Sequence, residues 1–389
     1  MRKYGQSHQW IKFSANLAQS PPQLWMKLGE AASKCDHIAG IPLQPYVAEQ
    51  LHQIYLAKGV VATTAIEGNT LSEKDVLEHL EGKLELPKSK DYLRQEVDNI
   101  INACNQIGSE LLQGNLPSLS GKRIKDFNGL VLHGLKLEDD VITGEFRTHS
   151  VVVGNIYKAP PAEDCDYLID RMCNWLTGED FQSPDEETKI VYALLRAIIA
   201  HLYIAWIHPF GDGNGRTARL IEFQMLLEAG VPFPAAHLLS NHYNQTRQEY
   251  YRQLNLTSKS GGDIIPFVKY AVDGFVDGLK EQLRLIRFQQ WNVAWRNYVH
   301  ESFQDKNSVA EVRQRRLALD LAQQQEHVPI SKIAELTPRL AKAYANKSPK
   351  TISRDVNELV KIKLVEKTSK GIRARKEIIL AFLPSRASD

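Results

Sequence analysis

Cysteine is scarce in this 389-residue sequence, which contains four: Cys35, Cys104, Cys165 and Cys173. None of them forms a Cys-x-x-Cys pair, and four are too few to build a disulfide scaffold of this size. We therefore expect reduced thiols and, because disulfides persist in oxidising compartments, a cytoplasmic protein. The N-terminus lacks the apolar core of a signal peptide, which agrees with that expectation.

Net charge is also nearly absent, at +2, so the composition gives no global affinity for nucleic acid or membrane. The most apolar long stretch, residues 190–207, carries Arg196 and His201, and we do not expect it to span a membrane. The small net charge hides an asymmetry: residues 330–378 contain 13 Lys and Arg against 5 Asp and Glu, a net of +8, which leaves −6 for the remainder. This asymmetry predicts a separate basic module near the C-terminus.

Internal repeats and low-complexity tracts are missing as well, and apolar residues recur instead at helical spacing along most of the chain. We therefore predict a mainly α protein, with residues before about 40 wrapped over its surface. Ser72, followed three residues later by Asp75, predicts an additional capped helix start. The other predicted helices are residues 46–58, 60–68, 92–112, 124–133, 165–175, 187–207, 216–229, 247–254 and 265–303.

Residues 141–161 differ from this helical background. Two short runs of β-branched and aromatic residues, 151–153 and 156–157, flank Gly154 and Asn155. The pattern is typical of a β-hairpin, and a lone hairpin is stable only when it packs on something else. From the residues alone, a plain structural hairpin and a flap over a site are both open.

The C-terminal residues predict a winged helix-turn-helix domain. Segments 309–324, 330–335 and 348–361 have helical patterns, and 364–367 and 377–380 are predicted to pair as a hairpin. In the third helix Ser348 is the candidate N-cap and Pro349 occupies the first position. Basic residues that could contact nucleic-acid phosphates are Lys350, Arg354, Lys367, Lys370, Arg373, Arg375 and Lys376. The same fold also serves protein docking and dimerisation, so the fold alone leaves its role open.

One stretch, residues 208–219, has the sequence His-Pro-Phe-Gly-Asp-Gly-Asn-Gly-Arg-Thr-Ala-Arg. Gly213 and Gly215 directly precede a predicted helix, where glycines allow close approach and the N-terminal N–H groups can bind an anion. Arg216 and Arg219 lie three residues apart, on one face of the first turn. Arginine opposes the helix dipole there, which is favourable if an anion lies between. The stretch is thus a candidate phosphate site.

Two further residues of this stretch could supply chemistry. Asp212 adjoins the glycines, and a carboxylate beside phosphates usually holds Mg²⁺. His208 follows an apolar helix, and an imidazole can accept a proton near neutral pH. Taken singly, each residue is more often structural. The stretch is neither a P-loop, since no Gly-Lys-Ser/Thr follows, nor a Rossmann fingerprint, since no strand precedes it.

Together these residues resemble the signature of the Fic family, His-x-Phe-x-Asp/Glu-Gly-Asn-Gly-Arg-x-x-Arg, at every fixed position. Fic proteins are helical enzymes that mostly transfer AMP from ATP to a hydroxyl side chain of a target protein. The resemblance implies that His208 is the general base, that Asp212 holds Mg²⁺ and that Arg219 holds the γ-phosphate. The ATP-binding residues that it implies in this stretch are Asp212, Gly213, Asn214, Gly215, Arg216, Thr217, Ala218 and Arg219.

A second stretch, Thr63-x-x-x-Glu67-Gly68-Asn69, is similar to the Ser/Thr-x-x-x-Glu-Gly/Asn inhibitory motif of that family. The resemblance implies an inhibitory helix whose Glu67 pairs with Arg219 and prevents ATP from binding in its productive pose. Thr63 and Glu67 would share one helix face. An ordinary C-terminal acid is the alternative, but an acid is unfavourable at that end of a helix unless a cation pairs with it.

The hairpin residues Val151, Val152, Val153 and Gly154 resemble the Fic flap, which covers the nucleotide and docks the target segment by strand addition. They are therefore further candidate contacts of ATP. The implied organisation is an N-terminal helical region (1–115) with the inhibitory helix, a Fic catalytic domain (116–304) and the winged helix-turn-helix domain (305–389).

The sequence thus predicts an autoinhibited protein adenylyltransferase that uses ATP and Mg²⁺ to modify a Tyr, Ser or Thr hydroxyl and releases pyrophosphate. The alternatives are removal of AMP, transfer of another phosphate-containing group at the same site, or a DNA-binding regulator whose Fic domain senses nucleotide. The predicted partners are ATP and a target protein at the flap, with DNA and a second copy of the chain as further candidates and no membrane.

Overall fold

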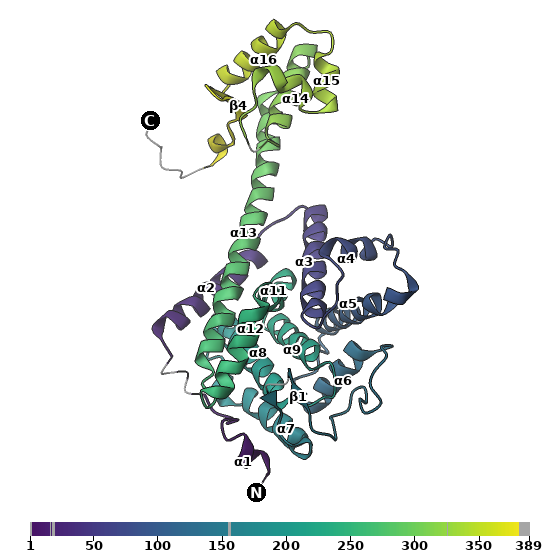
Figure 1. Ribbon diagram of the computed structural model, residues 1–389. Coiled ribbons are helices and arrows are strands. Elements are labelled where there is room, and N and C mark those ends of the chain that lie inside the picture. Colours follow the sequence, from purple (N-terminus) through teal and green to yellow (C-terminus); the bar gives the residue numbers. More distant parts are fainter. Residues whose placement is uncertain (1, 16, 18–19, 155–156, 325, 381–389) are drawn as a thin grey trace. The chain divides into compact units, whose positions relative to one another are not determined.

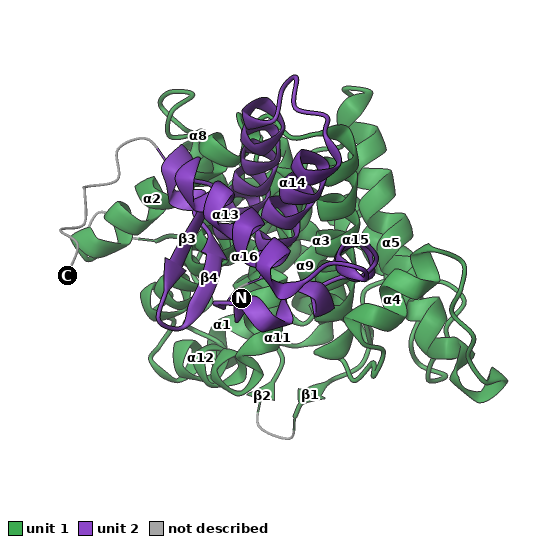
Figure 2. Ribbon diagram, turned by 90° about the horizontal axis from the view of Figure 1, so that it is seen from above, with its two compact units in different colours: residues 1–283 green, residues 284–389 purple. Residues whose placement is uncertain are grey.

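The structure, a computed structural model, describes residues 2–15, 17, 20–154, 157–324 and 326–380. Over these residues the chain is mainly α-helical, as predicted, with two short antiparallel strand pairs. It divides into two compact units, residues 1–283 and 284–389 (Figure 2). The N-terminal helices share one hydrophobic core with the rest of the first unit, so the domain boundaries expected near 115 and 304 stay a prediction.

The first unit is built around α8 (Lys189–Ile207), which is buried along nearly its whole length (Figure 1). It packs against α2 (Pro22–Ala39), α7 (Cys165–Leu176) and α9 (Asn214–Glu228). By length and composition α8 could cross a membrane, but 83% of its apolar window is buried inside the protein, as in a core helix. The other helices of this unit are α1 (Tyr4–Ser7), α3 (Pro45–Ala65), α4 (Glu73–Leu80), α5 (Asp91–Leu112), α6 (Gly121–Leu132), α10 (Phe233–Ala236), α11 (Leu238–Gln245) and α12 (Arg247–Lys259), with α13 (Ile265–Ser302) beginning in it.

Helix α3 corrects one prediction, because the two helices expected at 46–58 and 60–68 are one. The helix continues through Gly59, where a Cβ would overlap the ring of His237. Close packing there offsets the roughly 1 kcal/mol that glycine costs inside a helix. The helix ends at Ala65, three residues before Gly68, which adopts a φ of 106°.

Two other local expectations have mixed outcomes. The capping box of Ser72 and Asp75 is present at the start of α4, as predicted. The N-terminal residues, by contrast, include the 18-residue helix α2, whose buried Leu24 and Leu28 are part of the core instead of a surface wrap.

The predicted flap hairpin is present as β1 (Val152–Val153) and β2 (Tyr157–Lys158), paired antiparallel. Gly154 takes a φ of 56°, which suits a tight turn. Asn155 and Ile156, also part of the predicted turn, lie outside the described residues.

Of the three helices predicted in the second unit, two are α-helices and the one at 330–335 is a 3-10 helix, whereas the α-helix at 338–344 was not predicted. A hairpin follows, and the winged-helix assignment itself stays a prediction. The elements of this unit are α14 (Val309–Leu321), η5 (Ile330–Glu335), α15 (Pro338–Tyr344), α16 (Pro349–Lys361), β3 (Val365–Thr368), β4 (Gly371–Ala374) and η6 (Lys376–Ile379). The second strand was expected at 377–380 and is found at β4, because the chain turns directly after β3. Ser348 has the extended backbone of an N-cap, but its side chain makes no capping bond.

Candidate active site

The site forms where α8 ends and α9 begins. His208 ends α8 in the left-handed conformation, with a φ of 48°, and Gly213 takes a φ of 77° directly before α9. Asn214, the first residue of α9, closes the loop between them, because its side chain accepts a hydrogen bond from the Phe210 N–H and donates one to the Phe210 carbonyl, each at 2.9 Å. Phe210 is itself buried and anchors the loop in the core.

The buried guanidinium of Arg147 supports this loop from the flap side. Its Nε donates to the His208 carbonyl at 2.8 Å, and its two terminal nitrogens donate to the carbonyls of His149 (2.7 Å) and Pro160 (2.6 Å). Its backbone N–H also donates to the Pro209 carbonyl at 2.8 Å. Arg147 therefore ties the loop to both ends of the hairpin. No local pattern in the sequence marks Arg147 as a site residue, because its partners are distant carbonyls.

The electrostatic setting of His208 keeps its imidazole neutral. Burial, together with the positive charge of Arg147, lowers its pKa to about 4. A neutral imidazole near pH 7 can accept a proton.

Asn128, on α6, is a second site residue that no local sequence pattern marks. This fully buried side chain donates to the Asp212 carbonyl at 2.9 Å and accepts from the Gly144 N–H at 3.0 Å. It fixes the backbone of Asp212, whose carboxylate stays half-exposed.

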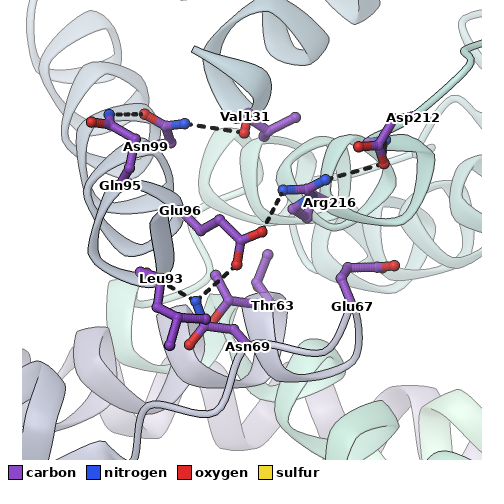
Figure 3. A network of polar contacts seen from close by, with 12 residues as sticks. Thr63, Glu67, Asn69, Leu93, Gln95, Glu96, Asn99, Val131, Asp212 and Arg216 are labelled. Atoms are coloured by element: carbon purple, nitrogen blue, oxygen red, sulfur yellow. Dashed lines mark hydrogen bonds and ion pairs between the residues drawn. The ribbon is translucent and has the colours of Figure 1, made fainter. Parts of the chain in front are cut away.

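The carboxylate of Asp212 belongs to a longer row of polar contacts (Figure 3). Its Oδ1 lies 3.1 Å from one terminal nitrogen of Arg216, and the other terminal nitrogen lies 3.4 Å from Oε1 of Glu96, on α5. Glu96 in turn accepts a hydrogen bond from the Asn69 amide at 2.8 Å. Asn69 is part of the motif around Glu67, whereas Glu96 was not singled out from the sequence.

The predicted contact between Glu67 and Arg219 is present. Arg219 is buried, and its guanidinium donates to Glu67 Oε1 at 2.5 Å and to the Thr63 carbonyl at 2.9 Å. Thr63 therefore contributes its backbone oxygen to the site. The Glu67 side chain is 33% exposed. Burial opposes its charge, but Arg219 and Arg216 outweigh burial and hold the pKa of Glu67 below its ordinary value.

Glu67 also lies directly over the start of α9. A Cβ built on Gly215 would overlap Glu67 Oε1 and would lie 3.0 Å from an Arg219 nitrogen. The N–H groups in the first turn of a helix have no intrahelical acceptor and attract anions. The Glu67 carboxylate therefore lies beside the first turn of this helix.

Behind Arg219 lies a buried polar layer. His201 pairs with Glu222 at 3.0 Å and with the Tyr250 hydroxyl at 2.7 Å, and Glu222 accepts from the Tyr243 hydroxyl at 2.9 Å. His201 is thus a core residue. Among the described residues no group of three or more His, Cys, Asp and Glu is arranged to hold a metal.

The hairpin is joined to the site from one side. The Tyr157 hydroxyl donates to the Trp206 carbonyl at 2.7 Å, near the end of α8. The carbonyl of Lys158, on β2, bonds His8 of the N-terminal segment at 2.8 Å. Val152, on β1, is 56% exposed. Both of these hydrogen bonds are made by residues of β2.

The residues predicted from the 208–219 stretch thus lie together, but not all in the same way. Thr217 and Ala218 face the core, so only their backbone atoms are available to a ligand. Asp212 can offer Mg²⁺ the oxygen ligand that this ion prefers, and a single carboxylate is enough when phosphates supply further oxygens. Its exposed carboxylate fits that role.

Residues 118–226 match the family described as Fic/DOC family. The chain is 32% identical over 234 residues to protein adenylyltransferase fic-1 of Caenorhabditis briggsae, covering 60% of this chain and 42% of that protein. It is 29% identical over 245 residues to protein adenylyltransferase Fic of Nematostella vectensis, covering 62% and 52%. The chain therefore spans about half or less of the length of these relatives.

Solved structures with a similar fold include two Fic proteins. A Fic family protein from Desulfovibrio desulfuricans has a TM-score of 0.54 at 22% identity, over 90% of this chain and 94% of that chain. Fic-1 of Caenorhabditis elegans has a TM-score of 0.54 at 24% identity, over 68% and 73%. At these identities the likeness extends to the fold alone.

Proposed function

From the premise that this chain carries a Fic domain over residues 118–226, we propose that it is an autoinhibited protein adenylyltransferase. It transfers AMP from ATP to a hydroxyl group of a target protein. The observation that carries the proposal is the ion pair of Glu67 with Arg219 above Gly215, because a carboxylate there takes the place of a nucleotide phosphate.

In the proposed reaction the oxygen of the target hydroxyl attacks the α-phosphorus of ATP, and the bond from that phosphorus to the bridging oxygen of the β-phosphate breaks. His208 removes the hydroxyl proton, for which its lowered pKa of about 4 keeps it neutral. The first turn of α9 and the guanidinium of Arg219 bind the phosphates. Asp212 would hold Mg²⁺, which neutralises charge on the leaving pyrophosphate.

Inhibition follows from competition for one arginine. While Glu67 occupies Arg219, the γ-phosphate has no cationic partner at that position, and ATP binds without its productive geometry. Phosphoryl chemistry depends mainly on positioning, so a misplaced α-phosphate costs most of the rate. Release of Glu67 from Arg219 would restore the pose.

The test uses purified wild-type protein, Glu67→Gly and the double variant Glu67→Gly/His208→Ala, each incubated with cell lysate, Mg²⁺ and ATP labelled at the α- or γ-phosphate. We expect protein labelling from α-labelled ATP by Glu67→Gly, little by wild type, and none by the double variant. Labelling from γ-labelled ATP instead would indicate transfer of a different group. Loss of AMP from pre-modified proteins, without new labelling, would favour the reverse reaction.

Docking of the target at the flap is part of the proposal. The β2 side of the hairpin is contacted by His8, whereas β1 exposes Val152, so a peptide could extend the sheet beside β1. Strand addition recognises backbone, which suits an extended segment carrying the acceptor hydroxyl.

A second activity, DNA binding, is favoured by one face of α16. Its buried side is fixed by Asp355, which accepts from Arg313 at 2.6 and 3.1 Å and from Tyr344 at 3.1 Å. The opposite side carries a stripe of exposed residues at helical spacing: Lys350, Arg354, Asn357 and Lys361. Cations and an amide in this arrangement suit phosphates and base edges.

The hairpin contributes fewer cations than the sequence predicted. Arg373 is paired with Glu366 and Glu377, and Lys376 is half-buried against Asn292, at 2.9 Å. The exposed cations of this part are Lys367, Lys370 and Arg375.

Fluorescence anisotropy with a duplex oligonucleotide tests this activity. Arg354→Glu should weaken binding and reduce its salt dependence, whereas Arg316→Glu, the same charge change at an exposed position of α14, should alter binding much less. Equal effects of the two substitutions, or no binding at 50 mM salt, would assign the unit to protein docking.

A further inference from the structure

The row of contacts in Figure 3 joins the segment that carries Glu67 to the carboxylate of Asp212. Its central member is Arg216, whose two terminal nitrogens have different carboxylate partners: Glu96 at 3.4 Å and Asp212 at 3.1 Å. Arg216 is 5% exposed and cannot gain a water shell easily if one partner is lost. The guanidinium is therefore shared between a carboxylate inside the site and one outside it.

The outer carboxylate has an independent anchor. Glu96 Oε2 accepts from the Asn69 amide at 2.8 Å, and Asn69 is itself fixed, since its amide donates to the Leu93 carbonyl at 2.9 Å and its side-chain oxygen accepts from the Leu71 N–H at 3.0 Å. Glu96 consequently stays oriented by neutral donors even when Arg216 moves. It can act as a fixed acceptor for that arginine.

We propose that Glu96 is a positioning residue for the metal site, because it draws Arg216 away from Asp212 when a cation binds there. A cation at Asp212 must compete with Arg216 for Oδ1. With Glu96 charged, the guanidinium retains a full ion pair after leaving Asp212. Without that charge, Asp212 is the one carboxylate in this row that still attracts Arg216, and the guanidinium is held more strongly at Asp212. Neutralising Glu96 should therefore weaken metal binding without touching the nucleotide.

The inference rests on the proposed binding of Mg²⁺ and ATP, and its test measures binding instead of transfer. Isothermal titration calorimetry gives the dissociation constant of ATP with Mg²⁺ and with excess chelator, in Glu67→Gly protein with and without Glu96→Gln. We expect Glu96→Gln to reduce the Mg²⁺-dependent gain in affinity roughly tenfold, as for residues that orient metal ligands. Affinity in chelator should change less than about twofold, a difference well below 1.4 kcal/mol.

A matched control is available on the same helix. Glu110, also on α5, pairs with the buried Arg123 away from the site, so Glu110→Gln removes a comparable charge from a comparable pair. It should leave the Mg²⁺-dependent gain unchanged. Glu96→Asp keeps the charge but shortens its reach, and should give an intermediate loss. If Glu96→Gln does not fold, the Mg²⁺-dependent gain in affinity of Glu96→Asp tests the proposal in its place.

Two results would overturn the inference alone: a full Mg²⁺-dependent gain in Glu96→Gln, or an equal loss of affinity with Mg²⁺ and with chelator. The second result would assign Glu96 a merely structural role. If the Glu67→Gly protein bound no ATP under either condition, the proposed function would fail together with this inference.

Discussion

The two flanks of the loop from His208 to Gly213 are fixed by different kinds of bond. On the flap flank Arg147 donates to neutral carbonyl oxygens, in hydrogen bonds that are buried or partly buried. On the opposite flank Asn128 also donates a neutral hydrogen bond, but Arg216 and Arg219 form ion pairs, and the carboxylate of Glu67 is one-third exposed. A buried hydrogen bond to a carbonyl is costly to break, whereas a partly exposed ion pair can exchange one anion for another. The flap flank is thus a fixed framework for the loop, whereas the ion pair on the other flank can be exchanged when a ligand anion binds.

The largest expected effect comes from breaking the framework flank. Arg147→Ala should lower the free energy of unfolding by roughly 3–5 kcal/mol, because buried carbonyls lose donors at about 1–3 kcal/mol each. The displaced His208 should cost on the order of 100-fold in AMP transfer measured in the Glu67→Gly background. Urea unfolding and labelling with α-labelled ATP measure the two effects. Arg171→Ala, at an exposed position of α7, is the control, and equal behaviour of the two variants would contradict the framework role.

Removing Glu67 from the opposite flank should change stability in a way that depends on ATP. Glu67→Gly leaves the buried Arg219 without its carboxylate partner, so the nucleotide-free protein should lose stability, by about 3 kcal/mol at most. ATP with Mg²⁺ should restore it, and should therefore raise the unfolding temperature more in Glu67→Gly than in wild type. An identical shift in both proteins would contradict exchange of Glu67 for a phosphate.

A substitution at Gly215 should displace Glu67 without activating the enzyme. In Gly215→Ala the new Cβ would displace the Glu67 carboxylate, yet it would also intrude where the phosphates bind. We expect about tenfold weaker ATP binding, or ~1.4 kcal/mol, and no activation. A rise in AMP transfer in this variant would show that the space above Gly215 is not needed by the nucleotide.

The smallest expected effect is on pH dependence. An imidazole with an ordinary pKa near 6.5 would be about nine-tenths protonated at pH 5.5 and would lose about tenfold in kcat/KM. His208, with its pKa lowered to about 4, loses its neutral form only as the pH falls toward 4. The kcat/KM of Glu67→Gly should therefore fall less than about twofold between pH 7.5 and 5.5. A tenfold fall would show that Arg147 and burial do not keep the imidazole neutral.

The contact between Glu67 and Arg219 could be anticipated from the sequence because both residues lie in recognisable motifs. Glu67 and Arg219 are 152 residues apart, and the structure brings them to 2.5 Å. Local patterns also located most helices, since apolar periodicity and capping residues act within one or two turns. A packing constraint such as that on Gly59 acts through a distant side chain, so the predicted break in α3 was wrong.

The supporting residues could not be found in the same way. Arg147, Asn128 and Glu96 act on backbone carbonyls or on side chains far away in the sequence, and no spacing rule connects them to their partners. The second strand of the C-terminal hairpin was misplaced for a related reason. Its register is set by a turn directly after β3, and apolar residues 378–380 gave a stronger local signal than β4.

If Glu67 suppresses AMP transfer by occupying Arg219, its removal must raise the rate of that transfer. The initial rate of protein labelling from α-labelled ATP is measured for wild type and Glu67→Gly at equal concentration, with Glu110→Gln as the charge-matched control. We expect at least a roughly tenfold higher rate in Glu67→Gly, equivalent to about 1.4 kcal/mol of barrier, and a wild-type rate in the control. Equal rates in wild type and Glu67→Gly would contradict inhibition by Glu67.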